Sequence, residues 1–469
     1  MRASCLFFAV VLVLQTGIPI SAQPNRQQTR IRWEKLVYED PKALIQETTL
    51  ELSKNPQNAL ALRMRSSALY RSNEPEKGKA DAAAALVLLS NPANAEEFEA
   101  KCYAERRVEK YDEALLSCTR AIELDPKYSW AYYNRGNANE GKKRFEQAVT
   151  DYTKAIELNI GFHDAYSRRG DVYTLNKEFD KAVTDFSKSI DLDPKRPSEF
   201  GRRAYAYFQK RDFDKAIADY GKAIELDPKG SSQYNSRGYI YWLKKELDLA
   251  IADFSKAVEL DPKGVAAYFN RGMAYQDKSN HDLAIADFTK VIERDPKAAF
   301  AYVYRGINYN DIREHDKAIA DYTRAIELDP KFAMAYNTRG KSYSDKKEYN
   351  LALADFTKAI QLEPKYALAY YNRGIVYVDK KEYDLAIADH TKSIEFDPKF
   401  APNYSYRGFA YTNKKEYDLA IADFSKAIEI DPKYIWAYNN RANAFEAKGE
   451  KTLADKDRQK ARELAGQPK

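Results

Sequence analysis

The sequence predicts an all-α solenoid in which antiparallel helix pairs stack side by side. Three observations predict this fold: a proline recurs every 34 residues, a small residue recurs in a second column, and apolar residues follow helical spacing between them. A strict period of this length is typical of helical repeats, because one helix pair cannot bury its apolar face without neighbours. We therefore expect a stack of repeats rather than one globular core.

The proline column marks the end of each repeat. It contains Pro92, Pro126, Pro194, Pro228, Pro262, Pro296, Pro330, Pro364, Pro398 and Pro432, and Ile160 interrupts it. Proline disfavours helical geometry in the residue before it, so Glu363, which precedes Pro364, is expected to leave the helix. The second helix of each pair should end at this point.

The repeat at residues 333–366 illustrates the predicted helix pair. Apolar residues at helical spacing predict an amphipathic second helix over residues 349–360, and the polar residues 345–348 predict a short link before it. Short links join antiparallel neighbours. Gly340 lowers helix propensity in the first helix, and we expect its missing side chain to let the second helix approach near Ala352.

The recurring positions of this unit resemble the tetratricopeptide repeat. They are Tyr336, Arg339, Gly340, Tyr343, Ala352, Phe356, Ala359 and Pro364, with Tyr and Arg where the family pattern has Trp and Leu. The resemblance implies a right-handed superhelical α-solenoid. It also implies that the first helix of each unit lines a concave groove.

The quality of the match divides the chain. Ten good units occupy residues 129–468, and residues 61–128 form two degenerate units. Residues 23–60 are expected to be an N-terminal helical segment. In the last unit Lys456, Arg458 and Glu463 are polar on a face that other units bury, which is expected of a capping repeat.

Residues 1–22 have the features of a secretory signal peptide. Arg2 precedes a short apolar run, and small residues lead to a cleavage site after Ala22. The run is too short to span a bilayer, and no later segment approaches that length, so we expect no membrane span after cleavage. An uncleaved anchor is the alternative. The sequence therefore predicts an exported protein, periplasmic or extracellular.

Two cysteines remain after this cleavage. Cys102 stands in the glycine column and Cys118 in the Phe column of their unit. An even pair in an exported chain is compatible with a disulfide. We expect two buried free thiols instead, because the two positions are interpreted as about one turn out of direct opposition.

Two charged columns accompany the repeat. Arginine recurs as Arg135, Arg169, Arg203, Arg237, Arg271, Arg305, Arg339, Arg373, Arg407 and Arg441, and aspartate as Asp151, Asp185, Asp219, Asp253, Asp287, Asp321, Asp355, Asp389 and Asp423. Uniform columns usually serve packing and register. We predict a ladder of Arg–Asp ion pairs along the stack.

Composition argues against several classes of function. With 76 Lys and Arg against 70 Asp and Glu, the formal charge is +6, and the signs alternate, so nucleic acid is not an expected partner. No HExxH, phosphate-binding loop or GxSxG is present, so we expect no enzyme, no cofactor and no metal. His281 and His315 are interpreted as surface residues rather than a shared metal site.

Variable positions on the first helices are the candidate binding residues. Three consecutive units place Tyr205, Phe208, Tyr239, Trp242, Phe269 and Met273 there. Aromatic and Met enrichment on a concave face is typical of peptide-binding surfaces. Extra packing between neighbouring first helices is the alternative, and the sequence leaves both open.

A column of acids near the ends of four first helices is a second candidate. It contains Asp277, Asp311, Asp345 and Asp379. An acid at a helix C-terminus opposes the helix dipole, which favours a basic or amine-bearing ligand as its purpose. Local structure is the alternative, because Asp345 with Glu348 is able to form a helix cap and lysines lie nearby.

These observations predict a non-catalytic scaffold that binds a peptide or protein segment in its groove. The alternative is a structural or assembly element of the cell envelope that binds glycan or self-associates. The family's clamp for carboxylate-terminated peptides requires a groove lysine one turn before an asparagine. Because this face lacks that lysine, chaperone tails are not expected ligands.

Overall fold

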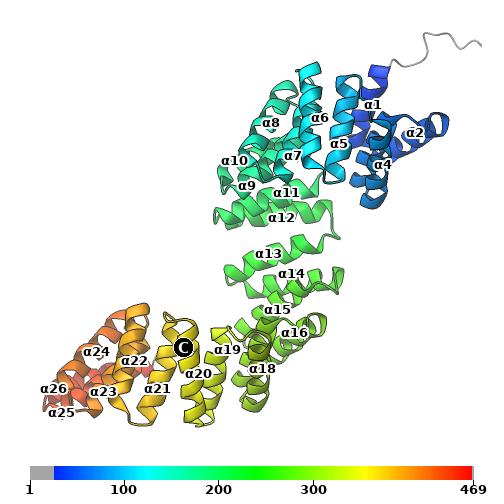
Figure 1. The fold of residues 1–469 in the computed structure, drawn as a ribbon. Coiled ribbons are helices and arrows are strands. Elements are labelled where there is room, and N and C mark those ends of the chain that lie inside the picture. The colour runs from blue at the N-terminus through cyan, green and yellow to red at the C-terminus, as the bar shows by residue number, and fades with distance from the viewer. Residues whose placement is uncertain (1–25, 467–469) are drawn as a thin grey trace, which may run out of the picture. The chain divides into compact units, whose positions relative to one another are not determined.

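A computed structural model describes residues 26–466, which form 26 helices and, within this range, no strand. The expected signal segment, residues 1–22, lies outside the described residues. The helices belong to two compact units, one ending at Leu226 and the other beginning at Asp227. Each unit is a stack of helices (Figure 1).

The first unit contains twelve helices. They are α1 (Arg26–Glu39), α2 (Pro41–Lys54), α3 (Ala59–Arg71), α4 (Pro75–Leu88), α5 (Ala95–Arg107), α6 (Tyr111–Leu124), α7 (Ser129–Gly141), α8 (Phe145–Leu158), α9 (His163–Leu175), α10 (Phe179–Leu192), α11 (Pro197–Gln209) and α12 (Phe213–Leu226).

The second unit contains fourteen helices. They are α13 (Ser231–Leu243), α14 (Leu247–Leu260), α15 (Val265–Asp277), α16 (His281–Arg294), α17 (Ala299–Asp311), α18 (His315–Leu328), α19 (Ala333–Asp345), α20 (Tyr349–Leu362), α21 (Ala367–Asp379), α22 (Tyr383–Phe396), α23 (Ala401–Asn413), α24 (Tyr417–Ile430), α25 (Ile435–Ala447) and α26 (Lys451–Ala465).

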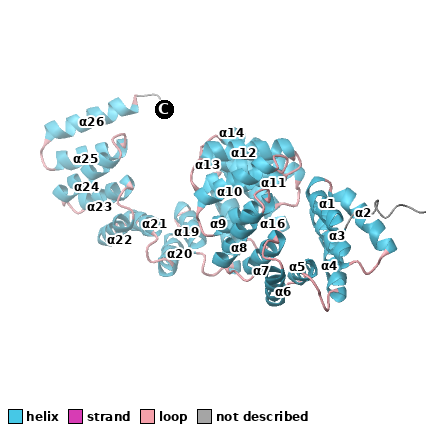
Figure 2. Ribbon diagram, turned by 90° about the horizontal axis from the view of Figure 1, so that it is seen from above, coloured by secondary structure: helices cyan, strands magenta, loops and turns pink. Residues whose placement is uncertain are grey.

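Within each unit the helices pack in consecutive pairs joined by short loops (Figure 2). In the second unit, for example, α19 packs against α20, and α20 then packs against α21 of the next pair. First helices also contact each other along the stack, as α19 contacts α21. The predicted all-α solenoid of helix pairs is confirmed.

The short link between the two helices of a pair turns on one residue of positive φ. After α19, Lys347 has φ 62°, and Glu348, the N-cap residue of α20, forms no side-chain capping bond. The same left-handed residue recurs in the other links, for example Lys381 at φ 62°. The alternative in which Asp345 and Glu348 form a helix cap is therefore wrong: the positive φ of Lys347 turns the chain, and no side chain caps α20.

Proline ends the second helix as predicted. Helix α20 stops at Leu362, and Glu363 has φ −128° and ψ 88°, outside the helical region. This is the backbone that Pro364 imposes on the residue before it.

The glycine column meets an aromatic ring. A Cβ on Gly340 would lie 2.8 Å from Cε1 of Phe356, closer than side-chain carbons pack. The expected close approach of the second helix exists, and the ring of Phe356, one turn after Ala352, supplies the nearest atoms. The two helices cross at a sequence separation of 16 residues, which places Phe356 opposite the glycine.

The same crossing explains Cys102 and Cys118. They form a disulfide, with their Cα atoms 5.3 Å apart. Cys102 holds the glycine position and Cys118 the aromatic position of their unit, so the two residues face each other directly. The expectation of two free thiols is therefore wrong, because it placed the opposing position one helical turn away.

Helix α1 departs from the paired pattern. Only Asp40 separates it from α2, so α1 does not lie in the usual place of a first helix. It runs instead beside successive first helices: Arg30 pairs with Glu96 of α5, and the ring of Tyr38 lies 6.1 Å from Trp130 of α7 and 4.4 Å from His163 of α9. The N-terminal helical segment thus covers part of the surface that those helices form.

Candidate binding surfaces

The six predicted aromatic and Met residues belong to both units. Tyr205 and Phe208 lie on α11 in the first unit. Tyr205 is 45 % exposed, and its ring lies 6.4 Å from that of Phe208. Phe208 in turn lies 6.0 Å from Phe213 of α12. Tyr205 is therefore accessible, and Phe208 links it to the second helix.

In the second unit, α13 presents an aromatic surface. Tyr239 is 37 % exposed and Leu243 is 38 % exposed. The rings of Tyr239 and Trp242 lie 5.6 Å apart, and Trp242 is half-buried. We call Tyr239, Trp242 and Leu243 the α13 aromatic surface.

Phe269 on α15 has a packing role. Its ring lies 5.6 Å from Phe288, 5.0 Å from Phe300 and 5.2 Å from Tyr304. These rings come from its own pair and from the next pair. For Phe269 the alternative interpretation, packing between neighbouring repeats, describes its surroundings. Met273, one turn further along α15, is half-buried.

Two members of the acidic column already have partners on the preceding pair. Asp277 accepts hydrogen bonds at 3.0 Å from Nε1 of Trp242 and at 3.0 Å from Nζ of Lys245. Asp345 accepts one at 3.2 Å from Nδ2 of Asn310. Both carboxylates thus join successive first helices.

All four acids are exposed, and the other two, Asp311 and Asp379, have different neighbours. Asp311 lies 3.9 Å from Nδ1 of His281. Partial burial raises the pKa of Asp379, while the charge of Lys347 opposes that shift. The four acids therefore have different surroundings on their separate helices.

The histidines have protein partners. His281 Nδ1 lies 3.0 Å from Asn308 Oδ1, and His315 Nδ1 lies 2.8 Å from Asn310 Oδ1. Across residues 26–466, no three His, Cys, Asp or Glu side chains gather closely enough to hold a metal ion.

The first unit contains a cavity that the repeat pattern does not predict. Its volume is about 300 Å³. Six arginines line it, Arg71, Arg106, Arg107, Arg168, Arg196 and Arg202, and the single acid in its wall is Asp164. The remaining lining residues are Val37, Tyr38, Ser67, Tyr70, Tyr103, Trp130, Tyr133, Asn134 and Ser167. We call it the arginine cavity.

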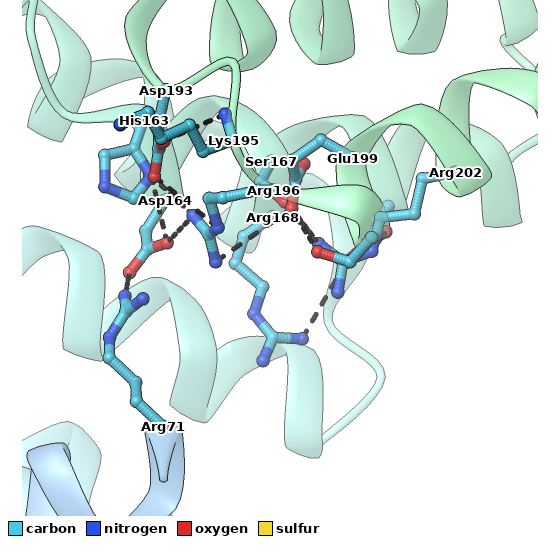
Figure 3. A network of polar contacts seen from close by, with 12 residues as sticks. Arg71, His163, Asp164, Ser167, Arg168, Asp193, Lys195, Arg196, Glu199 and Arg202 are labelled. Carbon is cyan, nitrogen blue, oxygen red and sulfur yellow. Dashed lines mark hydrogen bonds and ion pairs between the residues drawn. The ribbon is translucent and has the colours of Figure 1, made fainter. Parts of the chain in front are cut away.

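Asp164, on the first turn of α9, is shared by two arginines (Figure 3). Arg71 of α3 donates to Oδ2, and Nη1 of Arg196 donates to Oδ1 at 2.8 Å. His163 Nδ1 lies 3.2 Å from the same carboxylate. Although burial opposes it, these cationic and hydrogen-bonding partners hold the pKa of Asp164 well below its usual range. Asp164 therefore stays ionised, and its negative charge is already paired with two arginines of the protein.

Arg168 and Arg202 stand on the adjoining wall. Arg202 donates to Ser167 Oγ and to Glu199 Oε1, the latter at 3.0 Å, and lies 3.4 Å from Asp171. Arg168 is 3.8 Å from Asp171. Burial raises the pKa of Asp171 to about 6, although both arginines oppose the shift. These guanidinium groups have acidic neighbours outside the cavity lining.

Arg106 and Arg107, in the last turn of α5, differ from the other four. Among the described residues, no carboxylate forms an ion pair with either of them. Arg107 stacks instead on the ring of Tyr70, 3.6 Å from its centroid, and lies 5.0 Å from that of Tyr103. Burial and then the charge of Arg107 lower the pKa of Arg106 to about 10.

Comparison with protein families identifies the repeat. A tetratricopeptide repeat family matches residues 129–161, 163–196, 197–229, 265–298, 299–332 and 367–400, and a second TPR repeat family matches 238–279, 340–381 and 410–449. The chain belongs to the tetratricopeptide repeat proteins. Such repeats are typical of scaffolds for protein–protein interaction. A comparison with curated proteins gives no match.

Several solved structures are similar to this tetratricopeptide repeat chain. A crystal structure of MamA is 33 % identical over 34 % of this chain and 95 % of its own, with a TM-score of 0.32. YrrB, described as a TPR protein with an unusual peptide-binding site, is 24 % identical over 39 % of this chain and 95 % of its own, with a TM-score of 0.35. The Cut9–Hcn1 structure is 15 % identical over 90 % and 96 %, with a TM-score of 0.45.

One signal in the repeats points to the arginine cavity. The residue before each ladder arginine is Asn, Ser, Thr or Tyr in eight of the ten good units but arginine at Arg168 and Arg202. Similarly, Arg196 stands where other units carry an aromatic residue, glycine or alanine. That these arginines share one cavity with Arg106 depends on the stacking of degenerate units, which the repeat pattern does not define.

Within residues 26–466, no helix of this tetratricopeptide repeat chain has the length and apolar composition that a membrane span requires.

Proposed function

We propose that this chain is an exported, non-catalytic scaffold that binds a peptide or protein segment on the inner surface of its repeats. The observation that carries the proposal is the α13 aromatic surface, where Tyr239 and Leu243 stay more than a third exposed beside Trp242. Aromatic side chains on an accessible face are typical of the centres of protein interfaces. The expected ligand is a segment that inserts an apolar side chain between these residues.

Export is supported by two features of the chain. Residues 1–22 have the composition of a signal peptide. The Cys102–Cys118 disulfide is of a kind that persists in oxidising compartments. The proposed location is periplasmic or extracellular.

Affinity capture from the exported fraction tests the binding proposal. Trp242→Ala should remove the captured partner while circular dichroism shows unchanged helix content, because Trp242 is half-buried on the surface. Phe269→Ala is the matched control: it removes a ring that packs against three others, so it should lower the unfolding temperature. Equal capture by wild type and the Trp242 variant would contradict the proposal.

Self-association is a second candidate, favoured by a separate observation in the second unit. The same position in the first turn of six second helices carries an exposed leucine: Leu249, Leu283, Leu351, Leu385, Leu419 and Leu453, each 44 to 51 % exposed. A recurring row of exposed apolar side chains costs solubility unless something covers it. A second copy of the chain would match its 34-residue spacing.

Lysine substitution tests this candidate. Lys181, Lys215 and Lys317 occupy the same position in other units, so lysine is compatible with the fold there. If the row mediates assembly, changing Leu351 and Leu385 to lysine should abolish concentration-dependent light scattering without changing helix content. A wild-type chain that scatters as a monomer at all concentrations would exclude it.

A further inference from the structure

The arginine cavity carries more positive charge than its surroundings neutralise. Asp164 is shared by Arg71 and Arg196, and Arg168 and Arg202 share Asp171. Glu140, 3.8 Å from Arg168, and Glu199, 3.0 Å from Arg202, add two further carboxylates. The surplus comes from Arg106 and Arg107. Both side chains are half-buried, and the buried Nε of each has no hydrogen-bond partner. Because buried donors and charges are normally paired, these two guanidinium groups indicate that a partner from outside completes the site.

The two surplus groups are held in place. Arg107 lies against the faces of Tyr70 and Tyr103, and Arg106 lies 5.4 Å from the centroid of the Tyr103 ring. Stacking of this kind fixes the plane of a guanidinium group. The cavity thus presents oriented donors, and less conformational entropy is lost when a ligand binds.

We propose that the arginine cavity binds the phosphate group of a phosphorylated small molecule. A phosphomonoester carries close to two negative charges near pH 7, which matches the two surplus guanidinium groups, whereas a single carboxylate would neutralise one of them. Arginine binds phosphate oxygens through two parallel N–H donors. A cavity of about 300 Å³ also has room for an organic group beyond the phosphate.

The lining also suits an organic group. Tyr38 of α1 and Trp130 and Tyr133 of α7 line the same cavity as the arginines, and Cζ of Arg71 lies 4.2 Å from the centroid of the Tyr38 ring. Aromatic rings together with the hydroxyls of Ser67 and Ser167 suit a polar, ring-containing group such as a sugar. A sugar phosphate is therefore the probe of choice.

Isothermal titration calorimetry of the full chain tests the proposal, with glucose 6-phosphate, inorganic phosphate, glucose and succinate at equal ionic strength. We expect both phosphates to bind, the sugar phosphate more tightly, and glucose to give no heat. Succinate, a dianion without phosphate, should bind at least tenfold more weakly than inorganic phosphate. No binding of either phosphate at 10 mM, or equal binding of succinate, would overturn the proposal.

Arg106→Gln is the diagnostic variant. Removing an unpaired, half-buried charge beside Arg107 should leave the unfolding temperature unchanged or higher, and phosphate affinity should fall about tenfold or more with the loss of charge-assisted hydrogen bonds. Arg120→Gln is the matched control, since Arg120 is an exposed arginine of the same unit that pairs with Glu123 at 2.8 Å. Undiminished affinity in the Arg106 variant would overturn the proposal, as would an equal loss in the Arg120 variant.

The wild-type chain provides a readout that does not depend on any variant. Glucose 6-phosphate should raise its unfolding temperature, and glucose should not. Trp242→Ala, which tests the peptide-binding proposal, should bind glucose 6-phosphate as wild type does. The phosphate-binding proposal and the peptide-binding proposal can therefore be contradicted independently of each other.

Discussion

The guanidinium group of Arg339 holds both carboxylate oxygens of Asp355. Nε and Nη2 donate to Oδ2 and Oδ1 at 2.8 Å each, and Nη1 donates to Oγ1 of Thr323, on the preceding pair, at 3.1 Å. One side chain thus joins the two helices of its own pair and links that pair to its neighbour. The same contacts recur at Arg373, with Asp389 and Thr357.

A double-mutant cycle measures the ion pair. Asp355→Ala leaves the largely buried Arg339 without its counter-ion and should lower the free energy of unfolding by about 2–3 kcal/mol. Because the double variant has no orphaned charge, we expect a coupling energy of about 1–3 kcal/mol in urea unfolding. Additive single effects would show that the ladder does not couple. Thr323→Val, which removes the third contact alone, should cost about 1 kcal/mol.

The disulfide should stabilise the first unit. It closes a loop with a sequence separation of 16 residues, for which the chain-entropy model gives about 3 kcal/mol. Replacing both Cys102 and Cys118 by alanine should lower the free energy of unfolding, measured in urea, by about 3 kcal/mol. Wild type in reductant should have the same free energy of unfolding as the variant. Mass spectrometry of a non-reduced digest identifies the bridge directly; separate thiol peptides would contradict it.

His390 and Asn403 depart together from the repeat pattern. Their neighbouring units carry Phe356 and Phe424, and Ala369 and Ala437, at the corresponding positions. Both His390 and Asn403 are fully buried, their Nδ1 and Oδ1 atoms are 3.5 Å apart, and His390 Nε2 and Asn403 Nδ2 have no hydrogen-bond partner. Because Asn403 is buried, its Asn-Tyr-Ser sequon is closed to glycosylation in the folded chain.

Restoring the pattern should stabilise the second unit. The double variant His390→Phe with Asn403→Ala removes two unsatisfied polar groups and should raise the free energy of unfolding by about 1–2 kcal/mol. His390→Phe alone should gain less, since Asn403 stays buried. A double variant less stable than wild type would show that the pair contributes favourably.

The pair also predicts a pH dependence. Burial lowers the pKa of His390 to about 3, so the folded chain keeps this side chain neutral while the unfolded chain protonates it near pH 6.5. Stability should therefore fall as the pH drops below about 6.5, and the double variant should lose that part of the fall. Urea unfolding at pH 7.5 and pH 5 measures the difference between the two proteins.

Glu34 should give the opposite dependence in the first unit. Burial, opposed by Arg30 and Arg63, raises its pKa to about 7, above the ordinary value of 4.5 for a glutamate side chain. The folded chain therefore binds the proton more strongly, and its stability should decline as the pH rises from about 4.5 to 7. We expect Glu34→Gln to remove about 1–3 kcal/mol of this decline. An identical pH profile in wild type and variant would contradict the assignment.

The sequence by itself determined the helix pairs. Gly340, Phe356 and Pro364 recur at fixed spacing because each acts within one unit: the glycine admits the ring, and the proline ends the helix. The Arg339–Asp355 pair followed from the same periodicity. Contacts within one repeat can be predicted from a single sequence, because the same residues recur at the same positions in every repeat.

Only the tertiary structure decided which residues meet where the repeat is degenerate. The direct opposition of Cys102 and Cys118 depends on where two helices cross, which helical spacing alone does not fix. The arginine cavity combines side chains from five first helices and α1, and the position of α1 depends on its single-residue connection to α2. Contacts between residues far apart in sequence are set by how the helices pack, and no local pattern encodes them.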